Sequence, residues 1–330
     1  MRIGLLTGGG DCSGLNAAIR AIVRVATSHG DEIIAFHRGW RGVVEGDASP
    51  LSLQDTKGIL QSGGTILGTA RFHPDRHEGG IDAIKSSVVE ERIDALIVLG
   101  GNGTLGSAMH LSEAGVAIVG IPKSIDNDVA GTNQCIGFDT AVTTAAEAID
   151  RIHTTGESHD RLMVVEVMGR ATGWLAICSG IAAGADAICI PEEPTDLDEL
   201  ARAIHRRHDS GPSSSIVVVA EGAYSKRGRA ELGASSGEAV ATALSERTGY
   251  ETRLTVLGHI QRGGTPTATD KLLATRCGVA AIEAVRSKAF GTMVALGDGA
   301  IELVPLSEVA NSPRPVPQAL LDVAHQLTVS

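Results

Sequence analysis

The chain has 330 residues, a formal net charge of -11, 43 % hydrophobic residues and 2 % aromatic residues. This length predicts one large α/β domain or two packed ones, and the acidic charge, scattered basic residues and few aromatic side chains argue against a nucleic-acid partner. The five cysteines form no CxxC pair and no signal peptide or membrane span is evident, so the sequence predicts a cytoplasmic protein with reduced thiols and no membrane partner.

The first predicted strand, residues 2–7, runs into the consecutive glycines Gly8–Gly10 and a helix over residues 15–29. A dinucleotide-binding turn would need the order GxGxxG and an acidic residue at the end of the next strand. The glycine spacing here differs, and the next strand, residues 32–37, ends in histidine. The pattern weakens a dehydrogenase interpretation but keeps a glycine-rich turn at the carboxyl end of a strand.

A second glycine-rich turn, Gly100–Thr104, follows the apolar run 94–99, which is typical of a buried parallel strand. The turn leads into a helix predicted over residues 104–113. Glycines allow close backbone approach and the amides of a helix N-terminus favour negative charge, so we expect a phosphate here. The alternative is a tight turn that binds nothing. Upstream, Arg71 lies in a loop with few acids, either as solvated surface or as an anion contact.

The strand predicted over residues 116–121 ends in the segment Pro122–Asp128, which holds two carboxylates beside a lysine. Buried carboxylates are costly to desolvate unless a proton or a cation uses them. Asp126 is therefore a candidate general base, and Asp128 is a candidate metal ligand or supporting group. The alternative is an Asx-type turn that caps the next helix, residues 140–152.

The chain beyond residue 138 reads as a second α/β set, because apolar runs alternate with helical patterns. Its expected strands are 162–168, 187–190, 216–220 and 255–257, and the other expected helices of the chain are 81–89, 174–183, 196–207, 269–287 and 317–327.

Seven stretches, in this order, resemble the bacterial-type 6-phosphofructokinase family, including its ATP- and pyrophosphate-dependent actinobacterial members. The glycine-rich central turn alone also resembles NAD kinases and lipid kinases, which lack the other segments. The seven are Gly8–Asp11, Gly68–Phe72, Gly100–Thr104, Pro122–Asp128, Met168–Arg170, Glu221, and Glu251–Arg253 continuing through Gly258–Gly264.

The resemblance implies two similar three-layer α/β/α domains with an active-site cleft between them, and a homotetramer whose sites are shared between subunits. It also implies transfer of the γ-phosphoryl of ATP to the 1-hydroxyl of fructose 6-phosphate, a glycolytic reaction that uses magnesium. The expected domains are 1–137 plus 261–311 for the phosphoryl donor and 138–260 plus 312–330 for the sugar phosphate.

By position, Asp126 matches the base that accepts the hydroxyl proton. Gly10 and Arg71 match groups that contact the transferring phosphoryl, with Arg170 near them, and Ser124 stands where the family usually has threonine. The catalytic candidates are thus Asp126, Arg71, Arg170 and Gly10. The candidates for donor binding are Gly10, Arg71, Phe72, Gly101, Asn102, Gly103, Thr104 and Lys123.

The resemblance assigns three roles around the sugar phosphate. Ring contacts match Met168, Gly169 and Glu221; 6-phosphate contacts from the same subunit match His259 and Arg262; arginines from a neighbouring subunit match Arg161 and Arg253. With Ser124, Asp126, Asp128 and Arg170, these are the substrate-binding candidates.

Two positions depart from the family pattern. Asn102 replaces the usual metal-binding acid, so we expect weaker magnesium binding at Asn102 with Asp128 as a second ligand. Gly103 leaves room for a nucleotide where pyrophosphate-dependent relatives carry aspartate, although Lys123 resembles those relatives. ATP is therefore favoured over pyrophosphate. A kinase of a related ketose phosphate and a catalytically weak sugar-phosphate sensor stay open as alternatives.

Overall fold

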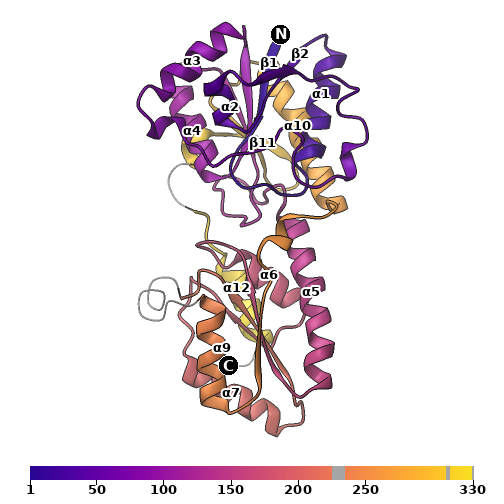
Figure 1. The fold of residues 1–330 in the computed structure, drawn as a ribbon, viewed down its shortest axis with the longest axis vertical. Helices are drawn as coiled ribbons and strands as arrows, with labels where there is room; N and C mark the ends of the chain where they lie inside the picture. The colour runs from indigo at the N-terminus through magenta and orange to yellow at the C-terminus, as the bar shows by residue number, and fades with distance from the viewer. Residues whose placement is uncertain (225–234, 310–312, 329–330) are drawn as a thin grey trace. The chain divides into compact units, whose positions relative to one another are not determined.

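The computed structural model of the protein describes residues 1–224, 235–309 and 313–328 (Figure 1). The chain divides into two compact units, one made of Met1–Thr140 and Arg262–Pro313, the other of Ala141–Gln261 and Arg314–Ser330. Each unit contains a mainly or wholly parallel sheet with helices packed on it. The α/β class expected from the sequence is therefore confirmed.

The first unit is built on a seven-stranded sheet in the order β11-β10-β5-β4-β1-β2-β3. The five inner strands are parallel, and β3 and β11 pair antiparallel at the two edges. Strand β4 is buried along its whole length, which explains its uninterrupted aliphatic sequence. The strands are β1 Arg2–Thr7, β2 Glu32–Phe36, β3 Ala48–Pro50, β4 Ala95–Gly100, β5 Ile118–Pro122, β10 Thr292–Leu296 and β11 Ile301–Pro305.

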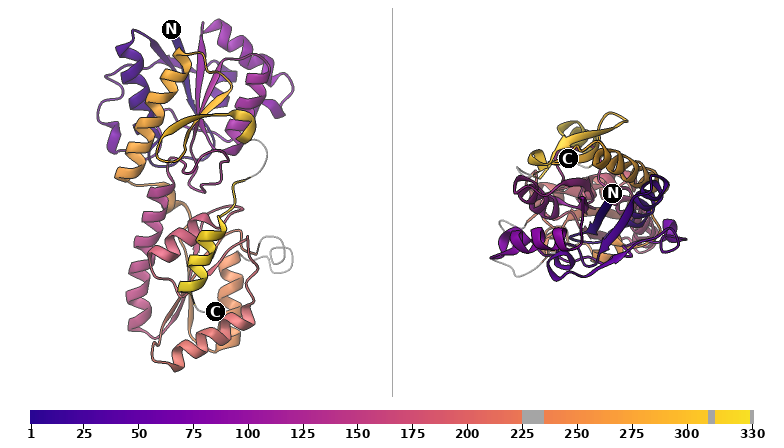
Figure 2. Two further views of the ribbon diagram at one scale, coloured as in Figure 1. Left: turned by 180° about the vertical axis from the view of Figure 1, so that it is seen from behind. Right: turned by 90° about the horizontal axis from the view of Figure 1, so that it is seen from above.

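Helices cover both faces of this sheet (Figures 1 and 2). On one face α1 packs closely against α10, because a side chain at Gly278 would meet the carbonyl of Ala18. On the other face, Phe36, Trp40 and Leu105 share one hydrophobic core. The helices are α1 Leu15–Ser28, α2 Trp40–Glu45, α3 Gly80–Glu90, α4 Asn102–Glu113, α10 Ala268–Arg286 and α11 Leu306–Val309, with the short 3₁₀ turns η1 Ile59–Gln61 and η2 Pro74–Arg76.

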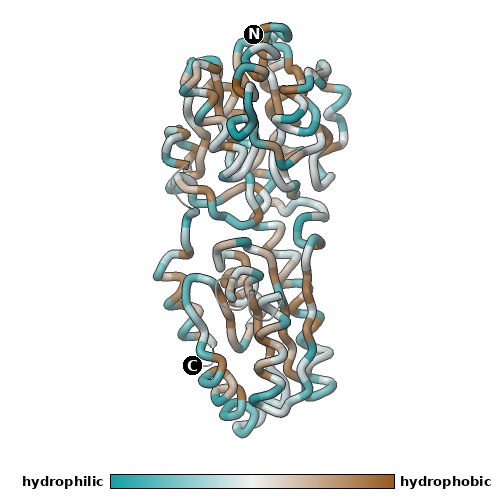
Figure 3. Tube along the Cα trace, turned by 60° about the vertical axis from the view of Figure 1, so that its left-hand side comes forward, coloured by the Kyte–Doolittle hydropathy of each residue, from teal (hydrophilic) through white to brown (hydrophobic). Residues whose placement is uncertain are grey.

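The second unit has a four-stranded parallel sheet in the order β7-β8-β6-β9. Its central strands β6 and β8 are fully buried. Figure 3 shows hydrophobic and hydrophilic stretches alternating along the chain in both units. The strands are β6 Leu162–Val167, β7 Ala187–Cys189, β8 Ser215–Ala220 and β9 Thr252–Val256, and the helices are α5 Phe138–Ser158, α6 Trp174–Ala182, α7 Leu197–Asp209, α9 Ser236–Thr248 and α12 Gln318–Leu327, with η3 Gly258–Arg262.

The sequence reading misses several elements. Helix α4 begins at Asn102, two residues earlier than expected, and β9 begins at Thr252. The strand expected over residues 255–257 begins earlier than the sequence predicts, because β9 lies at an edge of its sheet and none of its residues is buried, so no apolar run marks its start. The segment after Gly39 forms α2 because Trp40 is buried. The unpredicted elements are α2, α9, α11, β3, β10 and β11.

In the described part of the chain, we find no helix that combines the length and the apolar character needed to cross a membrane.

Candidate functional site

Three neighbouring strands place the predicted phosphate-binding segments together at the carboxyl ends of the strands of the first sheet. Strands β1, β4 and β5 are parallel, so the segments that follow them leave the sheet on the same side. The amide of Gly8 donates to the carbonyl of Leu99 at 2.9 Å, and the amide of Lys123 donates to the carbonyl of Gly100 at 2.9 Å. Open α/β sheets bind ligands at the carboxyl ends of their strands, so these segments occupy a suitable position for a phosphate site.

Lys123 supports the first glycine-rich turn from within the protein. Its Nζ donates to the carbonyls of Gly8 and Gly10 at 2.9 and 2.5 Å. The residue is 3 % exposed, and this burial lowers the pKa of its ammonium group. The amine is thus engaged by the turn, and it places a positive charge directly beneath the predicted phosphate site.

Thr104 sets the distance between the two glycine-rich turns. A Cβ atom at Gly8 would lie 2.7 Å from Cγ2 of Thr104, and one at Gly100 would overlap the Thr104 side chain. The carbonyl of Thr104 accepts a hydrogen bond from Nε1 of the buried Trp40 at 3.2 Å. Because Thr104 is 3 % exposed, its structural role is to pack the start of α4 against both turns.

The carboxylate of Asp128 is held by two neighbouring side chains. Nδ2 of Asn102 donates to its Oδ2 at 2.9 Å, and the hydroxyl of Ser124 donates to its Oδ1 at 3.0 Å. The same hydroxyl accepts from the backbone amide of Asp126 at 3.1 Å. Four of the predicted site residues therefore form one connected group after β4 and β5, and Ser124 links the candidate base to the candidate metal ligand.

The orientation of the Asn102 amide follows from its partners. Its Nδ2 faces the carboxylate and the carbonyl of Asp128, which are both acceptors, so the opposite orientation would set oxygen against oxygen. Its buried Oδ1 has no hydrogen-bond partner among the described residues. An orphaned amide oxygen beside a carboxylate fits a magnesium ion, which keeps several waters and takes few protein ligands. The described residues contain no cluster of three or more histidine, cysteine, aspartate or glutamate side chains suited to a metal.

The loop that carries Arg71 lies over the start of α4. Arg71 is exposed, and Phe72 is half-buried and stacks on His77 with ring centroids 4.6 Å apart. The amide of Gly9 donates to the carbonyl of Ala70 at 3.1 Å, which joins this loop to the first glycine-rich turn. The loop therefore brings an exposed guanidinium and an aromatic ring to the same carboxyl ends of the strands.

Arg262 belongs to the first unit, as do the substrate-binding candidates Ser124, Asp126 and Asp128. Its Nη1 donates to the carbonyl of Asp11 at 3.2 Å, and its guanidinium packs so closely on Gly10 that a Cβ atom there would overlap it. A side chain at position 10 would displace the guanidinium of Arg262.

In the second unit, the segment after β6 and the end of β8 carry the predicted contacts for a sugar ring. Gly169 has a φ of 135° and Arg170 a φ of 55°, a left-handed backbone that costs energy at a non-glycine residue. The amide of Arg170 donates to Oε1 of Glu221 at 2.8 Å, and the amide of Met168 donates to Oε1 of Gln261 at 3.3 Å. These contacts leave the guanidinium of Arg170 exposed.

Arg161 and Arg253 converge on one carboxylate oxygen, Oε1 of Glu251. The Arg161 contact is 2.9 Å, and Arg253 binds the same atom. The hydrogen bond from Arg161 lowers the pKa of the Glu251 carboxyl. The two arginines thus form a cationic pair at the starts of β6 and β9, and the exposed His259 follows in η3.

Three residues of this arrangement were missed from the sequence: Glu251 as the partner of the arginines, Gln261 as the partner of Met168, and Thr69, whose hydroxyl donates to the carbonyl of Gly9 at 2.8 Å. Each lies inside a stretch that was recognised, but a polar residue next to a motif carries no signal of its own contacts.

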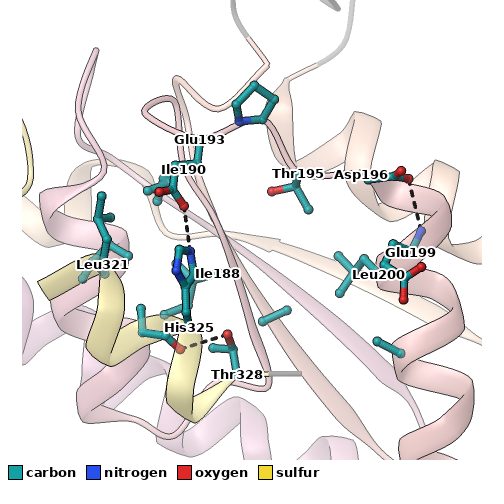
Figure 4. Close-up of a pocket in the computed structure, with 15 residues that line it drawn as sticks. Ile188, Ile190, Glu193, Thr195, Asp196, Glu199, Leu200, Leu321, His325 and Thr328 are labelled. Carbon is teal, nitrogen blue, oxygen red and sulfur yellow. Dashed lines mark hydrogen bonds and ion pairs between the residues drawn. The ribbon is translucent and has the colours of Figure 1, made fainter. Parts of the chain in front are cut away.

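A separate cavity of about 270 Å³ lies in the second unit, between α6, α7 and α12 (Figure 4). Its mouth carries an ion pair between Nε2 of His325 and Oε2 of Glu193, 2.7 Å apart. Asp196, which also lines it, caps α7 by accepting from the amides of Asp198 and Glu199. The predicted site residues do not line this cavity, and its walls are mainly aliphatic.

Comparison with known proteins gives one family. The family model described as "Phosphofructokinase" matches residues 2–285. An "ATP-dependent 6-phosphofructokinase 3" of Streptomyces coelicolor is 49 % identical over 97 % of both chains. A "Pyrophosphate--fructose 6-phosphate 1-phosphotransferase" of Amycolatopsis methanolica is 48 % identical over 96 % of both chains. The similar relatives therefore include both donor types.

Solved structures give the same result for the fold. The phosphofructokinase of Saccharomyces cerevisiae aligns with a TM-score of 0.84 and 34 % identity over 99 % of this chain. The chain spans 46 % of that longer protein.

Proposed function

Because the chain belongs to the phosphofructokinase family and is a phosphotransferase of that family, we propose that it transfers a phosphoryl group to the 1-hydroxyl of fructose 6-phosphate. The observation that carries this proposal is the connected group of Asn102, Ser124, Asp126 and Asp128 at the carboxyl ends of β4 and β5. It combines a candidate base with a candidate metal site beside two glycine-rich turns.

Asp126 acts as the general base in this proposal. The Ser124 hydroxyl fixes the backbone of Asp126 by accepting from its amide, and it fixes the Asp128 carboxylate by donating to it. A base held in this way is ready to take the proton of an attacking hydroxyl. Ser124 replaces the usual threonine without loss of either hydrogen bond.

The donor-side residues supply positive charge and backbone donors. The amides at the start of α4, the amide of Gly10, the exposed guanidinium of Arg71 and the buried ammonium of Lys123 would offset negative charge on the transferring phosphoryl. Phosphoryl transfer requires mainly positioning and charge stabilisation, so these groups and one base are sufficient.

Oδ1 of Asn102 and the carboxylate of Asp128 would hold magnesium, either directly or through water. Magnesium neutralises charge on the phosphates of the donor when it is bound. The amide brings no negative charge, so we propose that Asn102 weakens magnesium binding relative to an aspartate at the same position.

For the sugar phosphate, we propose contacts with Met168, Gly169, Glu221, His259 and Arg262. Arg161 and Arg253 would bind the 6-phosphate of a neighbouring subunit's site, which requires an oligomer, and we propose the homotetramer that the family resemblance implies. Guanidinium groups suit this role because they offer paired donors to phosphate oxygens.

The free state of all five cysteines supports the proposed location in a reducing cytoplasm.

ATP is the proposed donor, on the argument that Gly103 carries no side chain, and pyrophosphate is the alternative that Lys123 favours. Lys123 is weak support for pyrophosphate because its ammonium group already binds two turn carbonyls. A kinase of a related ketose phosphate and a sugar-phosphate sensor are the remaining alternatives, but a sensor would not need the base Asp126.

The test is formation of fructose 1,6-bisphosphate from fructose 6-phosphate and magnesium, with ATP and pyrophosphate in parallel. Asp126→Asn should lower kcat by about 10²–10⁴-fold with little change in the KM for the sugar. Asp82→Asn, on the exposed face of α3, is the matched control. Binding of fructose 6-phosphate without turnover would instead support the sensor.

A further inference from the structure

The side chain of His73 packs against Gly103, the residue whose missing side chain favours ATP as the donor. Its Nδ1 lies 3.2 Å from the carbonyl oxygen of Gly103. A carbonyl only accepts hydrogen bonds, so Nδ1 carries the proton and donates. A Cβ atom added to Gly103 would lie 2.5 Å from Cε1 of His73 and within 3.4 Å of both ring nitrogens. The imidazole thus fills the space beside Gly103.

The backbone on both sides of this contact is fixed. The hydroxyl of Ser107 donates to Oδ1 of Asp75 and to the carbonyl of Gly103, and Nδ1 of His110 lies 3.2 Å from Oδ2 of Asp75. Burial by itself would raise the pKa of the Asp75 carboxyl, but the hydrogen bonds from Ser107 and His110 hold that pKa below its usual value. Asp75 therefore ties the loop to the outer face of α4, and His73 cannot move without loss of contacts at the helix start.

The room that Gly103 leaves by having no side chain is therefore limited by the His73 ring. Gly103 is the second residue of α4, where the helix amides are aimed at the predicted donor phosphates. A donor that ends at its second phosphate needs less space here than one that continues into a third phosphate and a nucleoside. The group that borders this space is the His73 ring.

We propose that His73 is a specificity-determining residue for the phosphoryl donor. Its imidazole restricts the space beside Gly103 and disfavours ATP, the larger donor, relative to pyrophosphate. The proposal rests on the proposed function and assigns to His73 a selection that the sequence alone attributed to Gly103. Steric exclusion of this kind is a usual source of discrimination between related ligands.

The packing is tested by a double-mutant cycle that requires no activity. Alanine favours a helix over glycine by about 1 kcal/mol, so Gly103→Ala should raise Tm by about 2–4 °C where its methyl group fits. We expect that gain in the His73→Ala background and a loss of about 2 °C when His73 is present. His29→Ala, at an exposed helix end in the same unit, is the matched control background. A gain of Tm in both backgrounds would contradict the packing.

The selection is tested by dissociation constants for ATP and pyrophosphate, measured by titration calorimetry with magnesium. His73→Ala should shift the ratio of the two constants about tenfold in favour of ATP, and His29→Ala should leave it unchanged. A ratio within twofold of the starting protein would overturn the proposal, even if the Tm cycle confirms the contact. Because binding is measured without turnover, this failure is distinguishable from the absence of phosphofructokinase activity.

Discussion

At the scale of single residues, Asn102 shows how one amide changes the chemistry of a carboxylate site. Its Nδ2 lies 2.9 Å from Oδ2 of Asp128, so the position usually held by an acid here supplies a hydrogen-bond donor. Two carboxylates at this distance would repel each other unless a cation or a proton lay between them. The amide therefore allows the pair to form without a metal, and the charge available to a metal is reduced.

Asn102→Asp should make the site depend on its cation. We expect Tm without magnesium to fall by about 2–5 °C, because a hydrogen bond is replaced by like-charge repulsion, and we expect magnesium to restore it. The concentration of magnesium needed for half-maximal rate should fall. Thermal denaturation with and without magnesium, alongside the magnesium dependence of turnover, checks this; unchanged values for both would show that Asn102 does not tune the metal.

Lys123 gives a second prediction at this scale. Lys123→Met keeps the length of the side chain but leaves the carbonyls of Gly8 and Gly10 without their donor. Loss of the partner of a buried acceptor costs about 1–3 kcal/mol, so we expect lower stability and a donor KM raised at least several-fold. Lys57→Met, at an exposed position in the same unit, is the control. Urea denaturation and donor kinetics should separate the two variants, and equal behaviour would contradict the supporting role.

At the scale of elements, Asp270 in the first turn of α10 fixes the start of α5. Its Oδ1 accepts from the amide of Gly137 at 2.9 Å, and its Oδ2 accepts from the amide and hydroxyl of Thr140 at 2.8 and 2.5 Å. The residue is fully buried, and burial raises the pKa of its carboxyl above 3.8. Its carboxylate thus satisfies amide groups that would otherwise be orphaned at the beginning of a helix.

Asp270→Asn should destabilise the protein, because one of the two oxygens becomes an NH₂ group that faces N–H donors. We expect a loss of about 1–3 kcal/mol in the free energy of unfolding at neutral pH. The raised pKa also sets a pH dependence: the folded state holds the proton more tightly, so this group's contribution is most favourable at low pH and declines as pH rises from 3.8 through the folded pKa. Urea unfolding between pH 4 and 8 measures both effects; an unchanged pH profile in the variant would contradict the assignment.

The elements that could be predicted are those whose sequence reflects burial. Continuous aliphatic runs identified β4, β6 and β8, and glycines after β1 and β4 identified both turns. The hairpin of β10 and β11 was missed because every residue of β11 is exposed or half-buried. Helix α9 was missed because its sequence has little amphipathic pattern. Local pattern carries no information about which edge or surface a segment will cover.

For the candidate site, sequence supplied the members but not their partners. It placed Asp126, Asp128 and Asn102 in motifs, and the structure adds that Ser124 and Asn102 bind the same carboxylate. The contact of His73 with Gly103 could not be predicted, because it depends on how a loop thirty residues away packs on α4. Contacts between segments distant in sequence arise from the fold, and neither segment alone has a sequence pattern that predicts them.

At the scale of the whole molecule, the exposed edge of the second sheet bears on the proposed tetramer. Strand β9 lies at an edge of its sheet, and Leu254 and Val256 on it are 36 % and 52 % exposed, with Ile260 in η3 59 % exposed. Arg253, which we propose binds the 6-phosphate in a neighbouring subunit's site, lies on the same strand. Unpaired strand edges with apolar side chains favour association with another chain.

Val256→Lys should therefore weaken the oligomer, because a charge is poorly tolerated in an apolar contact between subunits. If the neighbouring subunit supplies Arg161 and Arg253, the variant should also show a KM for fructose 6-phosphate raised at least tenfold at low protein concentration, with the donor KM nearly unchanged. Val323→Lys, at an exposed position of α12, is the matched control. Sedimentation velocity and kinetics over a range of protein concentrations measure both properties. A Val256→Lys protein that keeps its oligomeric state and its sugar KM would place the interface elsewhere, and a monomer with normal kinetics would show that each chain completes its own phosphate site.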